Sequence, residues 1–247
     1  MSKDKKIRLD KLLVEKGLAP SQEKARALIY AGVVHIGPNR SVKPGKAVDP
    51  ATPVTVTAAP YPFVSRGGVK LQKALEVFGV EVKDKIALDI GASTGGFTHC
   101  LLLHGAARVY AVDVGYGQLA WEIRQDPRVK VLERVNARYL TKEQIGETVD
   151  LAVVDTSFIS LKLIVPPLLP ILREEGEIIV LVKPQFEVGK EKVGKGGVVR
   201  NEEDRRQVLT QLGRVFRSMG LKTLNLTDSP ILGAKGNREY FMHLKKG

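Results

Sequence analysis

The sequence predicts an α/β protein in two parts: a small basic α+β domain at residues 1–59 and a body at residues 65–247 with a seven-stranded, mainly parallel sheet. Two observations predict the body. Strand and amphipathic helix patterns alternate after residue 85, as in a parallel sheet covered by helices. The last two strand patterns are joined only by residues 228–238, too short for a helical crossover, so the final strand is expected to be antiparallel.

The charge distribution predicts the separate N-terminal domain. The chain has 247 residues and a formal net charge of +12. Residues 1–60 hold 11 Lys and Arg against 5 Asp and Glu, so half of the net charge lies in a quarter of the chain. A basic module of this kind favours a polyanionic partner, because binding releases condensed counterions. Generic solubility is the alternative explanation of the charge.

Within the basic module, apolar residues recur at helical spacing in two places. Leu9, Leu12 and Leu13 predict one short helix, and the repeat at 25, 28 and 29 predicts a second, with Ser21 as its N-cap. Short strand patterns follow at 33–36 and 54–57. The candidate nucleic-acid contacts are the basic residues Arg8, Lys11, Lys24, Arg26, Arg40 and Lys43. For each residue alone a solvated surface charge is the favoured interpretation, so only the cluster carries the prediction.

Two prolines mark the boundary between the parts. Pro60 and Pro62 favour extended neighbours, so residues 60–64 are predicted to form a stiff interdomain linker. A helix around residues 71–78 is expected to open the body. The predicted strands are 86–90, 108–113, 129–133, 150–155, 177–182, 221–227 and 239–244, and the predicted helices are near 97–104, 117–125, 159–172 and 202–219.

The sequence argues against several other classes of protein. Cys100 is the single cysteine, so no internal disulfide is possible, and the four histidines have no metal-ligand spacing; no metal site is expected. No apolar run reaches the length of a membrane span, and the N-terminus lacks the apolar core of a signal peptide. Cytoplasm is therefore the expected compartment, without a membrane partner. The oligomeric state is left open.

The most informative stretch is a strand followed by a glycine-rich turn and a helix start. It supplies the candidate cofactor-binding residues Asp89, Gly91, Ala92, Ser93, Thr94, Gly95, Gly96 and Phe97. Glycines allow a close backbone approach, and the free N–H groups of a helix start point at a ligand. The next strand ends in Asp113, followed by Val114, where this class of fold places the carboxylate that binds a ribose diol.

The spacing alone does not choose the cofactor. A dinucleotide site expects G-x-G-x-x-G, from which this loop departs, and Asp89 would place negative charge near a phosphate. S-adenosylmethionine (SAM) has a ribose and an adenine but no phosphate, and it carries an ammonium and a sulfonium that a carboxylate favours. An NAD-like cofactor and a ligand-free structural turn remain as alternatives. Seven strands with an antiparallel last one are more typical of a Rossmann-like SAM methyltransferase than of a dehydrogenase.

Unusual polar residues follow three other predicted strands. Asp155 and Lys183 each come after an apolar run, and Asn136, followed by Ala137, comes after the third strand. Carboxyl ends of parallel strands share one edge, where ligands bind. A lysine there is a candidate base, since a low dielectric disfavours its charged form. A lysine that extends to water is the alternative.

Two resemblances add to these patterns. Residues 1 to about 60, with Arg8-Leu9-Asp10-Lys11-Leu12 and Ala31-Gly32-Val33, resemble the S4 RNA-binding domain. The remainder is similar to the FtsJ-type RNA 2′-O-methyltransferases, and the combination, with the motifs at 183–187 and 194–200, resembles the TlyA/hemolysin-A family of ribosomal RNA methyltransferases. The resemblance implies a Lys-Asp-Lys-Glu catalytic tetrad at Lys70, Asp155, Lys183 and Glu239. Asp155 would also border the cofactor, and Arg66 would contact RNA.

The chain departs from the FtsJ pattern in two places. Gly67-Gly68-Val69 replaces bulkier residues before the first lysine, which would alter how RNA passes the site. Asn136 stands where many members have an aspartate, although its amide oxygen can still accept a hydrogen bond.

The resemblance implies a SAM-dependent ribose 2′-O-methyltransferase that acts on cytidine in the RNA of both ribosomal subunits. Lys183 would be the base or alkoxide stabiliser, oriented by Asp155; Lys70 would fix the neighbouring ribose or phosphate, and Glu239 would hold the lysines. The 189–200 segment is expected to be a mobile loop near this site. A non-catalytic SAM-binding RNA-binding or ribosome-assembly factor is the alternative. A lytic protein is disfavoured, since no long amphipathic basic helix is present.

Overall fold

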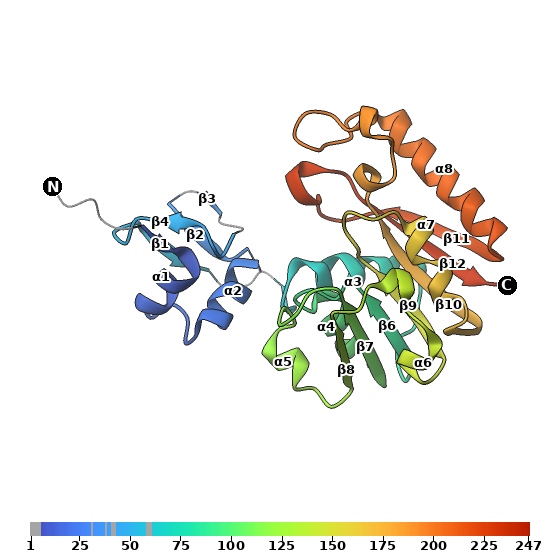
Figure 1. Ribbon diagram of the computed structural model, residues 1–247, viewed down its shortest axis with the longest axis horizontal. Coiled ribbons are helices and arrows are strands. Elements are labelled where there is room, and N and C mark those ends of the chain that lie inside the picture. Colours follow the sequence, from blue (N-terminus) through green and yellow to red (C-terminus); the bar gives the residue numbers. More distant parts are fainter. Residues whose placement is uncertain (1–5, 31, 38, 41–42, 58–60) are drawn as a thin grey trace. The chain divides into compact units, whose positions relative to one another are not determined.

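A computed structural model describes residues 6–30, 32–37, 39–40, 43–57 and 61–247. The chain divides into two compact units, residues 1–68 and 69–247, and each is described by itself (Figure 1). The division falls in the first turn of helix α3 (Arg66–Phe78). Residue 60 of the predicted linker lies outside the described residues. Phe63, within that linker, is 5% exposed and packs against Gly68, where a Cβ would lie 2.1 Å from the Phe63 ring.

The N-terminal unit packs two helices against short strands. Its elements are β1 (Ile7–Arg8), α1 (Leu9–Glu15), α2 (Gln22–Tyr30), β2 (Val34–Ile36), β3 (Asn39–Arg40), β4 (Ala47–Val48) and β5 (Val54–Val56). β1 pairs with β4, and β3, β2 and β5 form a second antiparallel sheet. The apolar residues that predicted the helices, among them Leu9, Leu13 and Ile29, are buried in one core. Ser21 Oγ accepts a hydrogen bond from Lys24 N, the contact of the predicted N-cap.

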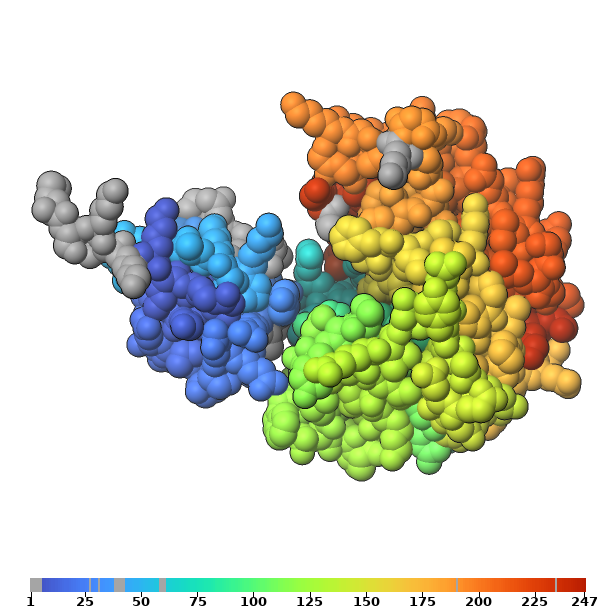
Figure 2. Space-filling view, in the orientation of Figure 1, coloured from blue at the N-terminus to red at the C-terminus, as the bar shows by residue number. Residues whose placement is uncertain are grey.

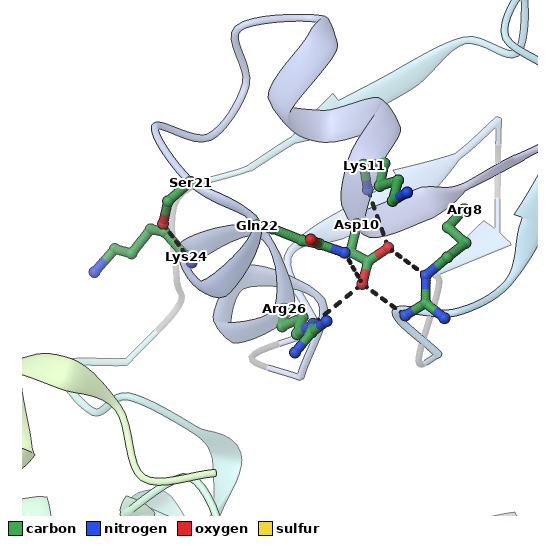
Figure 3. Close-up of polar contacts among 7 residues, drawn as sticks. All are labelled: Arg8, Asp10, Lys11, Ser21, Gln22, Lys24 and Arg26. Atoms are coloured by element: carbon green, nitrogen blue, oxygen red, sulfur yellow. Dashed lines mark hydrogen bonds and ion pairs between the residues drawn. The ribbon is translucent and has the colours of Figure 1, made fainter. Parts of the chain in front are cut away.

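A buried carboxylate organises this unit. Asp10 has no exposed surface, and it accepts hydrogen bonds from the Arg8 and Arg26 guanidiniums at 2.9–3.1 Å and from the Gln22 amide at 3.1 Å (Figure 3). The Lys11 backbone N–H also donates to it. Burial alone would raise the pKa of Asp10, but the donors hold it well below its usual range. Two of the predicted nucleic-acid contacts are therefore also structural ion-pair partners.

Neutralising this carboxylate should loosen the N-terminal unit. We expect Asp10→Asn to speed hydrogen exchange in α1 and α2 about 10- to 100-fold, because the hydrogen bonds that it weakens involve charged groups. Since folding depresses the pKa of Asp10, its stabilisation is complete above the unfolded pKa of about 4 and declines as the pH falls below it. Glu23→Gln, at an exposed position of α2, is the control. Unchanged protection in Asp10→Asn would contradict the role given to the carboxylate.

The body contains the predicted seven-stranded sheet. Its strands are β6 (Ile86–Ile90), β7 (Arg108–Asp113), β8 (Val129–Glu133), β9 (Val149–Val154), β10 (Leu172–Val182), β11 (Leu221–Asp228) and β12 (Tyr240–Lys246). The order is β11-β12-β10-β9-β6-β7-β8. β12 pairs antiparallel with both β10 and β11, as the short 228–238 connection predicted, while the ladders among β6 to β10 are parallel.

Helices cover the sheet on both sides (Figure 1). They are α3, α4 (Gly96–Leu103), α5 (Trp121–Arg124), α6 (Lys142–Ile145), α7 (Leu161–Ile164) and α8 (Glu202–Ser218). Side chains of β12 alternate between the two layers. Met242 belongs to the core that contains α6, α7 and α8, whereas His243 stacks on Phe78 of α3 and Phe241 contacts Phe97 of α4.

Two predicted helices are wrong in extent, and one helix was missed. The predicted helix at 159–172 is reduced to α7 and a 3-10 turn at Pro166–Leu168, and β10 already begins at Leu172. Pro166, Pro167 and Pro170 lack the N–H groups that a continuous helix needs. The helix predicted at 117–125 is confined to α5, because Gly117 has a positive φ of 65° and the N-cap Ala120 has a non-helical ψ of 138°. α6 was not predicted.

Candidate active site

The candidate site lies at one edge of the sheet. β6, β7, β9 and β10 all end there, and β12 begins there because it runs in the opposite direction. Asp155 follows β9, Lys183 follows β10 and Glu239 precedes β12. Val182 pairs with Tyr240 at the end of the β10–β12 ladder, so Lys183 and Glu239 are the next residues on neighbouring strands. Sheet topology thus brings these two residues, 56 positions apart in the chain, to the same edge.

The four predicted catalytic residues form two ion pairs. Lys70 Nζ of α3 donates to Glu239 Oε2 at 2.6 Å. Lys183 Nζ lies 2.6 Å from Asp155 Oδ1. Three of the four are nearly buried: the exposed fraction of the side chain is 12% for Lys70, 3% for Glu239 and 10% for Lys183. Ammonium groups with so little contact with water are held in place by their carboxylate partners.

The structure adds Ser157 and Gly233 to this group. Lys183 Nζ donates to Ser157 Oγ at 3.0 Å, so the lysine is held by two residues of the segment after β9. A Cβ on Gly233 would lie 1.8 Å from Glu239 Oε1, so only glycine leaves room for the carboxylate there. Sequence reasoning missed both. Ser157 lies two residues after Asp155, a spacing that could have suggested it, whereas nothing in the sequence indicates the contact of Gly233.

The glycine loop after β6 packs closely against two other segments of the body. Gly91 has φ +85°, and a Cβ there would lie 2.6 Å from the Asp155 carbonyl oxygen. Gly95 has φ +91°, and a Cβ there would lie 2.8 Å from Leu119 Cδ1. Asp113 at the end of β7 accepts the Ser93 N–H at 2.8 Å and the Gly115 N–H at 2.7 Å. These bonds fix the carboxylate beside the loop, and each oxygen retains capacity for a further donor.

The remaining predicted cofactor residues divide by exposure. Ser93, Val114 and Asn136 are exposed, and Thr94 and Ala137 are half-buried. Asn136 Oδ1 accepts the Arg138 N–H at 3.1 Å. Ala92, Gly96 and Phe97 are buried, so the ring of Phe97 belongs to the core and only its backbone can face a ligand.

Asp89 is the most deeply buried of the predicted cofactor residues. It has no exposed surface and accepts a hydrogen bond from Thr98 Oγ1 at 2.6 Å. Burial raises its pKa to about 7, with a smaller contribution from the negative charge of Asp155. The neutral and ionised forms of this carboxyl are therefore close in free energy near neutral pH.

The predicted nucleic-acid contacts are mostly at the surface. Exposed residues of this set are Arg8, Lys11, Lys24, Arg26, Lys43 and Arg66. The Arg40 side chain lies outside the part of the chain that the structure describes. The 189–200 segment, expected to be a mobile loop, is anchored at three points. The Gly194–Val198 bridge closes it, Asn237 bonds Val199 N and Gly197 O at 3.1 and 2.9 Å, and Arg205 donates to the Val199 carbonyl at 3.0 Å.

Two kinds of feature do not occur among the described residues. No group of three or more His, Cys, Asp and Glu side chains is arranged there to hold a metal ion. In the same residues, no helix has the length and apolar character required to cross a membrane.

A seven-stranded sheet with an antiparallel last strand, a glycine loop after β6 and a carboxylate at the end of β7 are the features of the class of Rossmann-like methyltransferases. The profile of the FtsJ-like methyltransferases matches residues 63–246, and that of the S4 domain matches residues 7–54. The chain belongs to the FtsJ-like methyltransferase family, with an S4 domain in front of the methyltransferase domain.

Similar proteins extend over nearly the whole chain. The 16S/23S rRNA (cytidine-2′-O)-methyltransferase TlyA of Mycobacterium tuberculosis is 49% identical over 98% of this chain and 90% of its own length. Hemolysin A of Brachyspira hyodysenteriae is 42% identical over 96% of this chain and 99% of its own length. The solved structure of a candidate hemolysin of Streptococcus thermophilus is 43% identical, with a TM-score of 0.77 over 98% of this chain and 89% of that chain.

Proposed function

We propose that this protein is a SAM-dependent ribosomal RNA ribose 2′-O-methyltransferase that acts on cytidine. The observation that carries the proposal is the arrangement of two lysine–carboxylate pairs at the sheet edge, with the backbone of Asp155 against Gly91 at the start of the glycine loop. The name of the Mycobacterium relative supports the substrate class. The S4 domain supports an RNA partner.

The residues present fit SAM. Gly91 and Gly95 hold the loop in a positive-φ turn packed against Asp155 and Leu119, and Asp113 lies beside this turn to accept hydrogen bonds from a ribose diol. Asn136 would lie at the adenine end, and Asp89 in its ionised form would favour the cationic amino-acid end. When bound, SAM supplies an electrophilic methyl group on its sulfonium.

Lys183 is the residue that acts on the ribose 2′-hydroxyl in this proposal. Loss of the hydroxyl proton accompanies formation of the oxygen–methyl bond. As a neutral amine Lys183 would receive that proton; as the ammonium paired with Asp155 it would stabilise the developing alkoxide, and the proton would leave to solvent. Asp155 and Ser157 each bind Nζ, and the nitrogen has a further bonding position that would face the substrate hydroxyl. Lys70, positioned by Glu239, would bind the neighbouring ribose or phosphate.

Methyl transfer from labelled SAM tests the function. Naked ribosomal RNA, separated subunits and assembled ribosomes are supplied in parallel, and the modified nucleotide is identified by mass spectrometry. We expect 2′-O-methylcytidine in at least one substrate. SAM and RNA binding without methyl transfer to any of them would support the non-catalytic alternative instead.

A separate prediction concerns the cofactor cradle. We expect Asp113→Ala to weaken SAM binding about 10- to 100-fold, because the variant lacks a charged hydrogen-bond acceptor. Gly95→Val should have a similar effect, since its side chain would meet Leu119 and its φ of +91° is strained for any residue with a Cβ. Calorimetric titration with SAM measures both, and Glu143→Gln on α6 is the control. Unchanged affinity in both variants would refute the assigned pocket.

A further inference from the structure

The motif at 183–187 ends in a glutamate that the proposed reaction does not use. Glu187 comes four residues after Lys183, in the segment after the 3-10 turn Pro184–Phe186. Its carboxylate faces the segment after β9. Glu187 Oε2 accepts a hydrogen bond from Ser160 Oγ at 2.7 Å, and Oε1 accepts one from the Leu161 backbone N–H at 2.7 Å.

These two bonds join the chain segments that carry the Lys183–Asp155 pair. Segment 155–161 contains Asp155 and Ser157, and segment 183–188 contains Lys183. The bonds of Glu187 place the two segments side by side, in the yellow to light-orange part of the body (Figure 2). The ring of Phe158 contacts that of Phe186 at 5.0 Å between centroids. The segments are thus connected at the catalytic pair, at the ring contact and at the carboxylate.

The carboxylate connection is the most rigid of these. A ring contact between Phe158, which is 90% exposed, and Phe186 constrains direction weakly. Two hydrogen bonds from one carboxylate to adjacent residues fix both position and angle. Ser160 is also the N-cap of α7 and accepts the Lys162 N–H at 3.2 Å, so its hydroxyl is oriented by the helix. Phe158 has a positive φ of 64°, a conformation that neighbouring bonds must hold.

The Glu187 carboxylate is held by hydrogen bonds to neutral groups. Its partners are a hydroxyl and a backbone N–H. Burial raises the pKa of its carboxyl, and those two bonds, with a smaller contribution from the charge of Lys162, oppose the rise. A merely structural link could be made with apolar side chains at less cost. A half-buried acceptor that bonds two adjacent residues is suited instead to setting a distance.

We propose that Glu187 is a positioning residue that sets the distance between Lys183 and the Asp155–Ser157 segment, and through it the place of Nζ at the reacting oxygen. This inference rests on the proposed methyltransferase function. Glu187 does not touch the substrate. Its effect is on the chemical step, because misplacement of a catalytic group by about 1 Å costs up to 100-fold in rate.

The test compares three variants in single-turnover methyl transfer at saturating RNA and SAM. Glu187→Ala removes both bonds and should slow the chemical step about 10- to 100-fold, with the binding of SAM and RNA within about twofold of wild type. Glu187→Gln keeps an oxygen for the Leu161 N–H and an amide that donates to Ser160 Oγ, so it should recover the rate to within about threefold. Val208→Ala, a core truncation in α8, controls for reduced stability.

A double-mutant cycle with Ser160→Ala isolates the hydrogen bond. The effects of Glu187→Ala and Ser160→Ala on the logarithm of the rate should be less than additive, because both remove the same bond. Additive effects, or a Glu187→Ala rate within threefold of wild type, would overturn the proposal. A Glu187→Gln rate as slow as that of Glu187→Ala would also overturn it.

Hydrogen exchange at Leu161 separates this inference from the proposed function. The amide should exchange faster in Glu187→Ala and at the wild-type rate in Glu187→Gln, whether or not the wild-type protein methylates RNA. Absence of methyl transfer by the wild-type chain would refute the function alone. Unchanged Leu161 exchange in Glu187→Ala would refute the bridge alone.

Discussion

Lys183→Ala is expected to lower the single-turnover rate of methyl transfer at least about 1,000-fold while SAM affinity stays within a few-fold of wild type. The lysine acts as the bond to the methyl group forms, and its amine is held by two partners in the segment after β9 rather than by the glycine loop. Quench-flow measurement of methyl transfer and calorimetry with SAM give the two quantities.

The control for this variant is Lys222→Ala, an exposed lysine on the outer strand β11. It removes the same chemical group on a strand that is not adjacent to the glycine loop in the sheet, and we expect it to leave the rate unchanged. Retention of more than about a tenth of the wild-type rate in Lys183→Ala would remove Lys183 as the central catalyst.

Removal of residues 1–60 is expected to abolish most RNA binding and most methylation while SAM affinity is retained. The deletion preserves Phe63 and its packing on Gly68 at the start of α3. It removes a region with 11 basic residues against 5 acidic ones. Because phosphate contacts supply much of the affinity for RNA, the body alone should bind RNA weakly. Filter binding over a range of salt concentrations measures the decrease in affinity.

Some point variants of the N-terminal unit would change its folding as well as its RNA binding. Arg8→Glu would place a carboxylate against the buried Asp10, so it tests folding as much as RNA binding. Lys11→Glu with Lys43→Glu alters exposed side chains instead. We expect the salt dependence of RNA binding to fall by about one unit for each phosphate that these side chains no longer bind. A truncated body that methylates ribosomal substrate at the full-length rate would show that the basic module is dispensable.

Local sequence was sufficient to predict most of the body. The central strands β6, β7, β9 and the second half of β10 are buried apolar runs, which located them closely. The edge strand β11 is mostly exposed and was located by its alternating apolar and polar residues. The antiparallel last strand followed from the length of the 228–238 connection alone. The glycine loop was visible because the positive φ values at Gly91 and Gly95 favour glycine in the sequence itself. Helix 159–172 failed because amphipathic spacing was given more weight than three prolines.

The sequence by itself determined which residues carry charge at the strand ends, and tertiary structure decided how they pair. Lys70 and Glu239 are 169 positions apart, and no local pattern predicts that they share an ion pair separate from that of Lys183 and Asp155. Arg8 is a second example. The sequence predicts only a nucleic-acid contact for it, whereas the structure also pairs its guanidinium with the buried carboxylate of Asp10. Charge is a property of the residue, whereas the partner and the exposure of that charge depend on which distant segments the packed sheet brings within about 3 Å.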